Sequence, residues 1–287
     1  MTPDSLAALV PDGALLALPP DNSLAPCAFA RALVRRSLAE QSAGGPGLRG
    51  LRLLGVPVSG FATDLLIGAG CVAQLQTSAV TLGEAGTAPR FSAAVAEGSI
   101  ELLDATCPAI HTMLQAAEKG VPYMPLRGLL GSDVLAHRPD WRVMPNPFGG
   151  PNPFGESSDL IVLLPALSPD IAAFHAVLAD AHGNVWVGRR RELATLAHAS
   201  RRVLVTVERV VEGNLLEDER LAPGVISATY VEAVAVAARG AWPSALLDEY
   251  PADAAHLRDY ARAARTVDGF RAYLDRHVTA AGGRDCA

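Results

Sequence analysis

The sequence has 287 residues, half of them hydrophobic and 5% aromatic, and its formal net charge is −6. This length suffices for one large α/β domain with a sizeable buried core, or for two small domains. The negative charge argues against a nucleic-acid-binding surface, because such a surface needs clustered basic residues to neutralise phosphates.

The four cysteines are scattered, at Cys27, Cys71, Cys107 and Cys286. None forms a CxxC pair, and no histidine cluster has zinc spacing, so we expect no metal site. The N-terminal stretch MTPDSLAALVPDG lacks the positive region of a signal peptide, and no apolar run approaches the ~20 residues of a membrane span. We therefore expect a cytoplasmic protein that binds no membrane.

In the first half of the chain, apolar runs predict strands, and apolar residues at helical spacing predict helices. Strands are expected at residues 13–18, 48–56 and 99–103, with two further apolar segments at 64–69 and 73–80. Helices are expected at residues 25–38, 89–97 and 108–119. Gly98 and Gly120 follow the last two helices, which is typical of a helix C-terminus.

In the second half, strands are expected at residues 159–165, 170–177, 184–187, 202–210 and 230–237, and helices at 190–199 and 253–277. Between the halves, residues 143–158 read VMPNPFGGPNPFGESS, and this density of Pro and Gly predicts a long loop. Such a loop is either a functional or interface element or a surface excursion. Strands of the same kind continue on both sides of it, so we expect residues 1–287 to form a single domain.

Strands that alternate with helices and read as continuous apolar runs predict an α/β fold. We expect an open, mostly parallel sheet covered by helices on both faces. Ligands of such sheets bind at the loops outside the C-terminal ends of the strands, so polar turns after strands are the candidate site.

The first two candidate turns contain Ser59 with Gly60, and Ser78. Ser59 and Gly60 follow an expected strand, and small residues there allow a ligand to approach the backbone. The Ser78 hydroxyl can donate a hydrogen bond to a carbonyl or carboxylate. For both serines the competing interpretation is a structural turn or cap hydroxyl.

The third candidate turn holds Thr106 and Cys107, just before a helix with Pro108 in its first turn. A helix N-terminus can bind an anion or lower a thiol pKa, so Cys107 is a conceivable nucleophile. A buried small-residue role for Cys107 is the favoured interpretation, because no histidine is placed in sequence to pair with it.

The fourth candidate turn holds Arg127 and Gly128. Arg127 lies between apolar residues and needs a partner, which can be a substrate carboxylate or phosphate, or an acid of this chain such as Asp133. Two weaker signals complete the set. His175 is expected to be a hydrogen-bonded structural histidine, and Glu208 to be a salt-bridge partner of a nearby arginine.

The order of five segments resembles the alpha subunits of type I CoA-transferases of the glutaconate CoA-transferase kind. The segments are DLLIGAG at 64–70, GTAPRF at 86–91, GVPYMPLRGLLGSD at 120–133, ADAHGNV at 179–185 and VTVERVV at 205–211. The similarity extends over residues 9–277. The resemblance implies an open α/β fold, a hetero-oligomer with a homologous β subunit, and an acyl-CoA and a small carboxylic acid as substrates.

The resemblance further implies ping-pong transfer of CoA through an acyl–glutamyl anhydride and a glutamyl-CoA thioester. The nucleophilic glutamate is expected on the partner, so this chain is expected to supply no catalytic residue and to hold no permanent cofactor. Ser59, Gly60, Ser78, Thr106, Cys107, Arg127 and Gly128 are expected to line the acyl pocket.

Two alternatives remain. A related branch hydrolyses a carbon–carbon bond in cyclic CoA thioesters of steroid-ring degradation, and its alpha subunit supplies an acid near the position held here by Thr106 and Cys107. The absence of that acid argues against the hydrolase. The sequence departs from the CoA-transferase pattern at residues 18–26, which lack the glycines that family members often have after the first strand, so the loop that lets the backbone approach CoA is expected to differ here. The other alternative is a non-catalytic ligand-binding or scaffolding chain.

Overall fold

The computed structural model describes residues 1–149, 159–246 and 248–280. Its helices are α1 Pro3–Ala7, α2 Cys27–Ser42, α3 Phe61–Gly68, α4 Pro89–Glu97, α5 Cys107–Glu118, α6 Arg191–Ala199, α7 Ala254–Ala263 and α8 Val267–Leu274. Its strands are β1 Leu15–Leu18, β2 Leu51–Gly55, β3 Val72–Thr77, β4 Glu101–Asp104, β5 Tyr123–Leu126, β6 Arg142–Pro145, β7 Leu160–Pro165, β8 Ile171–Asp180, β9 Val185–Trp186, β10 Arg202–Val211, β11 Val225–Ile226 and β12 Ala233–Val236.

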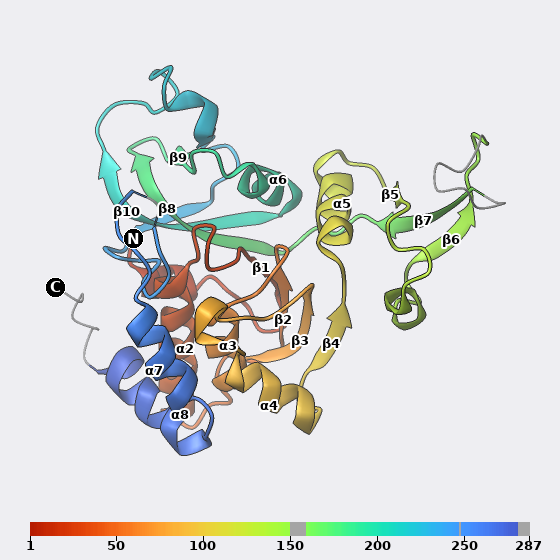
Figure 1. The fold of residues 1–287 in the computed structure, drawn as a ribbon. Helices are drawn as coiled ribbons and strands as arrows, with labels where there is room; N and C mark the ends of the chain where they lie inside the picture. The colour runs from red at the N-terminus through yellow and green to blue at the C-terminus, as the bar shows by residue number, and fades with distance from the viewer. Residues whose placement is uncertain (150–158, 247, 281–287) are drawn as a thin grey trace.

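The main sheet is mostly parallel, as predicted (Figure 1). Seven strands lie in the order β12-β10-β8-β1-β2-β3-β4, and every neighbouring pair is parallel. The short strands β9 and β11 add an antiparallel extension beside the end of β8. Strand order therefore runs in opposite directions on the two sides of the β1–β8 pair.

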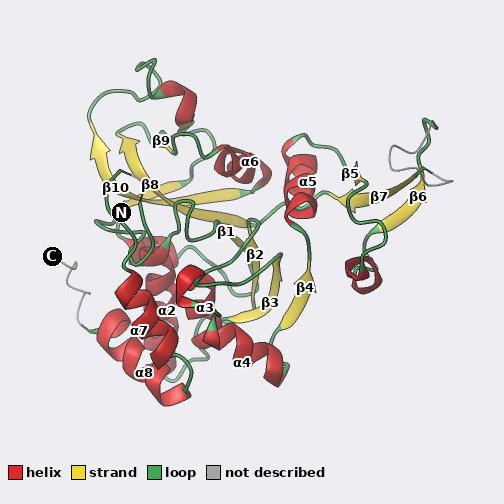
Figure 2. Cartoon of the chain, viewed as in Figure 1, coloured by secondary structure: helices red, strands yellow, loops and turns green. Residues whose placement is uncertain are grey.

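Helices cover both faces of this sheet (Figure 2). Buried side chains of α2, α3, α4, α7 and α8 form one hydrophobic cluster, whereas those of α5 and α6 belong to the other. Successive strand residues point to opposite faces, so Leu16 belongs to the first cluster and Ala17 to the second. The open α/β architecture expected from the sequence is confirmed.

Local sequence explains the helix ends that were predicted. Helix α4 begins at Pro89, whose fixed φ suits a first helical position, and ends before Gly98, which has a φ of 66°. The C-terminal segment is helical, as expected, but it is divided. Thr266 accepts a hydrogen bond from the Gly269 amide and so caps a second helix, α8, after α7 has ended.

A second sheet of three antiparallel strands, β5-β7-β6, extends away from the main body (Figure 1). The prediction of a loop over residues 143–158 was wrong for residues 143–145, which belong to β6. All four residues of β6 are exposed, so the strand lacks the buried apolar pattern on which the sequence prediction depended. Residues 146–149 form a turn, as predicted, and residues 150–158 lie outside the described residues.

Among the described helices, none is both long enough and apolar enough to cross a lipid bilayer.

Candidate functional site

The candidate site lies where the strand order of the main sheet reverses, between β1 and β8. In open α/β sheets, this switch point leaves a crevice outside the carboxyl ends of the strands, where ligands bind. The segment of residues 19–26 leaves β1 at this point. We call it the divider loop, because the structure has a cavity on either side of it.

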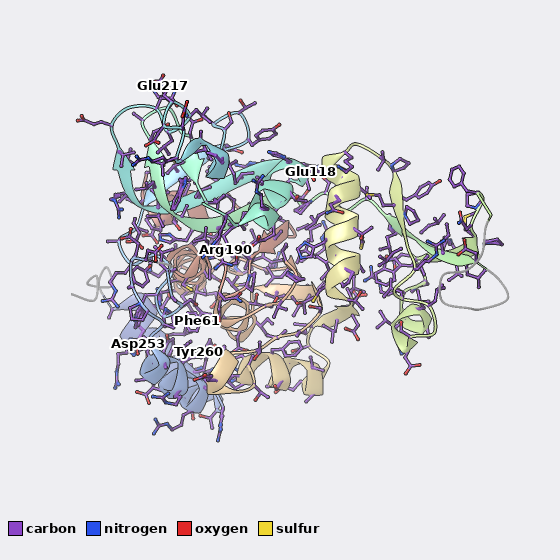
Figure 3. The ribbon with its side chains drawn as sticks, turned by 45° about the horizontal axis from the view of Figure 1, so that its top comes forward. Phe61, Glu118, Arg190, Glu217, Asp253 and Tyr260 are labelled. Atoms are coloured by element: carbon purple, nitrogen blue, oxygen red, sulfur yellow. The ribbon has the colours of Figure 1, made fainter. Side chains whose placement is uncertain are left out.

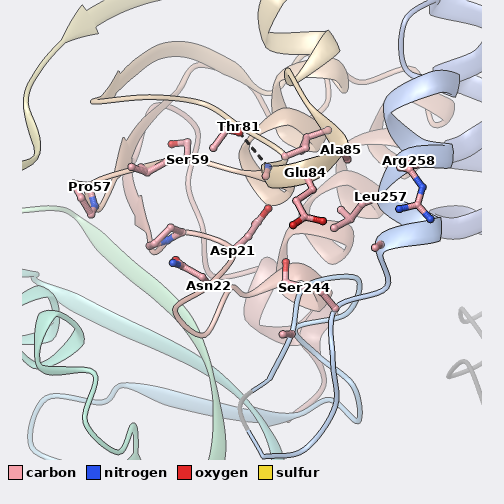
Figure 4. A pocket seen from close by; sticks show the side chains of 17 residues that line it. Asp21, Asn22, Pro57, Ser59, Thr81, Glu84, Ala85, Ser244, Leu257 and Arg258 are labelled. Atoms are coloured by element: carbon pink, nitrogen blue, oxygen red, sulfur yellow. Dashed lines mark hydrogen bonds between the residues drawn. The ribbon is translucent and has the colours of Figure 1, made fainter.

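The first cavity has a volume of about 580 Å³ and lies over the carboxyl ends of β1, β2 and β3 (Figure 4). Its wall is mostly apolar. The lining residues come from the divider loop, from the loops after β2 and β3, and from the segment that leads into α7: Pro20, Asp21, Asn22, Pro57, Val58, Ser59, Thr81, Leu82, Gly83, Glu84, Ala85, Ser244, Ala245, Ala252, Ala254, Leu257 and Arg258. The size and lining suit a small organic ligand.

Asp21 is the most perturbed polar group of this cavity. Its carboxylate accepts a hydrogen bond of 2.9 Å from the Phe61 amide at the start of α3. Burial raises the pKa of the Asp21 carboxyl group to about 6, although the Phe61 amide acts in the opposite direction. Gly60 permits this approach, because a Cβ atom on Gly60 would lie 2.3 Å from the Asp21 carboxyl group.

Ser59 and Pro57 line the first cavity, and Ser78 and Cys107 lie next to Pro57 without lining it themselves. The Ser78 hydroxyl donates to the Pro57 carbonyl oxygen at 2.9 Å and lies 3.2 Å from the Cys107 sulfur. Ser59 is buried, and its hydroxyl donates to Thr77 at 3.3 Å. The structure thus brings together residues from three predicted turns, after β2, β3 and β4.

Thr106 is the N-cap of α5, as the sequence suggested, and its hydroxyl accepts a hydrogen bond from the Ala109 amide at 3.4 Å. The interpretation of Cys107 as a buried small residue was wrong, since the side chain is exposed at the first position of α5. The sequence pattern misled because Cys107 begins the helix before the apolar face of α5 turns into the core.

Arg127 and Gly128 do not join the other candidates. Arg127 follows β5 in the three-stranded sheet, where its guanidinium makes two hydrogen bonds, of 3.0 and 2.8 Å, to the Asp159 carboxylate. Asn146 also donates to Asp159. This is the structural ion pair that the sequence left open, with Asp159 in the role considered for Asp133. Gly128 is the next residue of the same turn.

Sequence reasoning missed Asp21, Glu84, Ser244 and Arg258, which all line the first cavity. Asp21 lies in the segment that attracted notice only for its lack of glycine. Ser244 and Arg258 come from the far end of the chain, and no local pattern connects them to β1. Within the described ranges, no group of three or more His, Cys, Asp or Glu side chains is arranged to hold a metal ion.

No family model matches the sequence. The cholesterol ring-cleaving hydrolase IpdA subunit of Rhodococcus jostii is 30% identical over 262 residues, which cover 88% of this chain and 82% of that protein. The alpha subunit of 3-oxoadipate CoA-transferase from Pseudomonas knackmussii is 27% identical over 285 residues, covering 96% and 91%. An uncharacterised protein of Archaeoglobus fulgidus is 28% identical over 238 residues, and this chain spans half of that protein's length.

Among solved structures, glutaconate CoA-transferase of Acidaminococcus fermentans matches with a TM-score of 0.84, over 99% of this chain and 90% of that chain, at 24% identity. The chain belongs to the family of CoA-transferase alpha subunits.

Several of the segments that resemble the family have structural roles in this chain. Asp64 of the DLLIGAG segment is buried and accepts hydrogen bonds of 2.7 Å from the Tyr260 hydroxyl and the Phe91 amide, so it joins α3 to α7 and α4. Figure 3 labels Tyr260 beside Phe61, and their ring centroids are 4.9 Å apart. Gly68 ends α3, where a Cβ atom would meet the Phe270 ring at 2.5 Å.

Glu208 of the VTVERVV segment was expected to pair with an arginine, and this was wrong. It accepts hydrogen bonds from the His175 ring, the Tyr250 hydroxyl and the amides of Arg239 and Gly240. The neighbouring arginine pairs instead with Glu249. The expectation that His175 is a hydrogen-bonded structural histidine is confirmed, because its ring is buried and contacts Glu208 and a strand threonine.

Proposed function

We propose that this chain is the alpha subunit of a heteromeric CoA-transferase, which moves CoA between an acyl-CoA and a small carboxylic acid. The observation that supports this most directly is the mostly apolar cavity at the switch point, in a chain of this family. An acyl group needs an apolar pocket with a few polar groups at its rim to fix its orientation. Ser59, Gly60, Ser78, Thr106 and Cys107 are the residues that we assign to that rim.

The proposed chemistry uses a glutamate of the partner β subunit. Its carboxylate attacks the thioester carbonyl carbon and the C–S bond breaks. The CoA thiolate departs, and an acyl–glutamyl anhydride is formed. The thiolate then attacks the glutamyl carbonyl carbon and releases the first carboxylate product. The acceptor acid reverses both steps, so one hard exchange becomes a series of easier ones.

The carboxylates of this chain at the first cavity are poorly suited to that nucleophilic role. Asp21 is held by the Phe61 amide, and burial raises its pKa to about 6, so removal from water disfavours its charged form. Glu84 is exposed to solvent on a short helical turn. We therefore assign the nucleophile to the partner, and Arg127 to the structure of the three-stranded sheet.

The test is mass analysis of the co-purified two-chain complex after incubation with acyl-CoA and then borohydride or hydroxylamine. We expect a glutamate of the partner to be modified as its CoA thioester would be, to the alcohol by borohydride or to the hydroxamate by hydroxylamine with release of CoA, and we expect no turnover by this chain alone. The matched variant Glu84→Gln in this chain should retain this modification of the partner. CoA exchange by the single chain, or the same modification on Glu84, would refute the assignment of the nucleophile.

The second candidate is carbon–carbon bond hydrolysis of a cyclic CoA thioester, which the 30% identity to the Rhodococcus IpdA subunit favours. Against it, the start of α5 presents Thr106 and Cys107 where that branch is expected to have an acid. The same incubation separates the candidates, because hydrolysis incorporates solvent oxygen into a ring-opened product without an acceptor acid. A non-catalytic chain would yield neither a modified glutamate nor a product.

A further inference from the structure

A second cavity, of about 410 Å³, lies on the other side of the divider loop. Leu24 of that loop and Asp248 form part of its wall, and the remaining lining comes from β8, from β9 and the residues after it, from the start of α6 and from the connection before β11. The lining residues used below are Trp186, Gly188, Arg189, Arg190, Arg191 and Arg220. None of them belongs to the first cavity, so this pocket is separate from the proposed acyl site.

The wall of this second cavity is strongly cationic. Four of its residues are arginines, and its one acidic residue is Asp248. In the part of the chain that the structure describes, none of the four guanidinium groups forms an ion pair or a side-chain hydrogen bond with the protein. By contrast, Arg202 and Arg209 form bidentate ion pairs with glutamates.

Arg189, Arg191 and Arg220 are exposed and Arg190 is partly buried, so the lining of this cavity carries a solvent-accessible cluster of positive charge in a chain whose net charge is −6. The arginines come from two separate segments. Arg189, Arg190 and Arg191 lie at the start of α6, and Arg190 is labelled in Figure 3. Arg220 comes from the connection between β10 and β11. The fold therefore brings together positive charges from distant parts of the sequence. Guanidinium groups can bind phosphates bidentately, so this cluster suits a phosphate ligand.

The lining of the second cavity also includes an aromatic residue, Trp186, and two glycines, Gly188 and Gly224. Gly188 has a φ of 62°, and a Cβ atom there would lie 3.3 Å from the Trp186 ring. A Cβ atom on Gly224 would lie 2.6 Å from the carbonyl oxygen of Gly188. Gly188 therefore keeps the backbone close to the indole, and Trp186 is itself one of the residues that line the cavity. Aromatic faces of this kind accept planar bases by stacking.

We propose that the second cavity binds the phosphates of an adenine nucleotide, with the arginines on the phosphate oxygens and the base against Trp186. Two sources share this chemistry: the 3′-phospho-ADP end of the CoA substrate, and a free nucleotide. The assignment to CoA rests on the proposed function, whereas the phosphate site does not. The divider loop separates this pocket from the acyl cavity, so the pantetheine arm of a bound CoA would pass over that loop.

The test is calorimetric titration of the full chain, and of the two-chain complex, with adenosine 3′,5′-bisphosphate, ADP and adenosine. We expect adenosine 3′,5′-bisphosphate and ADP to bind. Adenosine should bind at least about tenfold more weakly, because it lacks the phosphate groups that accept charge-assisted hydrogen bonds from the arginines. The variant Arg190→Ala/Arg191→Ala should weaken bisphosphate binding by about tenfold or more. Arg262→Ala/Arg265→Ala removes the same charge from the exposed end of α7 and should change it less than twofold.

Arg220→Ala provides an independent check, because it lies outside α6 and cannot act by disturbing that helix. It should also weaken bisphosphate binding while the thermal unfolding midpoint stays unchanged. In the two-chain complex, competitive inhibition against acyl-CoA by the bisphosphate would identify the CoA end as the ligand, and binding without competition would identify a free nucleotide. Absence of phosphate binding, or binding that the arginine variants and the control reduce equally, would overturn the proposal even if CoA transfer is found.

Discussion

At the scale of single residues, Asp21 illustrates how a fold creates a functional group that sequence does not announce. Its neighbours in sequence are Pro20 and Asn22, which predict only a turn. The carboxyl group becomes unusual because Gly60, about 40 residues away, lets the Phe61 amide reach it and because burial removes it from water. Pattern reasoning found Gly60 as a close-approach position but had no means to identify what approaches it.

The raised pKa of Asp21 predicts a pH-dependent contribution to stability. Between about pH 4 and pH 6 the folded chain holds a proton that the unfolded chain has released, so Asp21 favours folding below this window and loses that contribution as pH rises through about 6. Asp21→Asn keeps an acceptor for the Phe61 amide but does not titrate. Relative to wild type, its free energy of unfolding should improve by about 2–3 kcal/mol between pH 4 and pH 7.5.

Urea unfolding at both pH values, read by fluorescence, measures this difference. Asp4→Asn, in a surface ion pair with Arg35, is the matched control and should show no comparable trend. Parallel stability–pH curves for Asp21→Asn and wild type would show that Asp21 titrates normally.

At the scale of elements, helices and strands were predicted most accurately where the local sequence pattern matches the burial that the element has in the fold. Helix α4 was placed to the residue, since Pro89 and Gly98 mark its ends regardless of what it packs against. Strands β7 and β10 were found because buried parallel or central strands read as apolar runs. Strands β5 and β6 were missed because both contain proline and largely face solvent, so neither propensity nor periodicity distinguishes them from a loop.

The ion pair between Arg127 and Asp159 fastens this three-stranded sheet. Hydrogen bonds from Asn146 and Arg127 lower the pKa of the Asp159 carboxyl group, so its contribution is present above about pH 4 and is lost as the pH falls further. We predict that Asp159→Asn accelerates hydrogen exchange of the β5, β6 and β7 amides at pH 7 and leaves β1 and β8 unchanged.

Hydrogen exchange followed by mass spectrometry measures this directly. Asp133→Asn, which removes the other acid considered from sequence, is the control and should exchange like wild type because Asp133 forms no ion pair in the described structure. Equal protection in Asp159→Asn and wild type would mean that the strand pairing alone holds the sheet together.

At the scale of the whole molecule, β8 joins the two halves of the main sheet. Ile171 and Ala172 pair with β1 on one side and β10 on the other. Ala17 and Ala172 are fully buried across this seam, and their small size lets the layers on both faces pack closely. The sequence predicted both strands but not their adjacency, because no local pattern records which parallel strands become neighbours.

Ala172→Leu should therefore destabilise the whole fold by about 1–3 kcal/mol through overpacking at this seam. Chemical denaturation should give a lower midpoint, and far-UV circular dichroism and fluorescence should still coincide because both halves of the sheet share β8. Ala73→Leu places the same extra atoms on an exposed strand position of β3 and should shift stability by less than about 0.5 kcal/mol. A lower midpoint in only one probe would mean that the halves unfold separately.

The divider loop is attached at three points to three different elements. Asp21 binds the α3 amide of Phe61, Ser23 donates to Glu192 of α6, and the Leu24 carbonyl oxygen accepts from the His175 amide of β8. A segment held in this way cannot shift toward one cavity without breaking a bond on the far side. The distance between the first and second cavities is consequently fixed by the protein. A molecule that occupies both cavities must therefore have a matching length, whatever its end groups are.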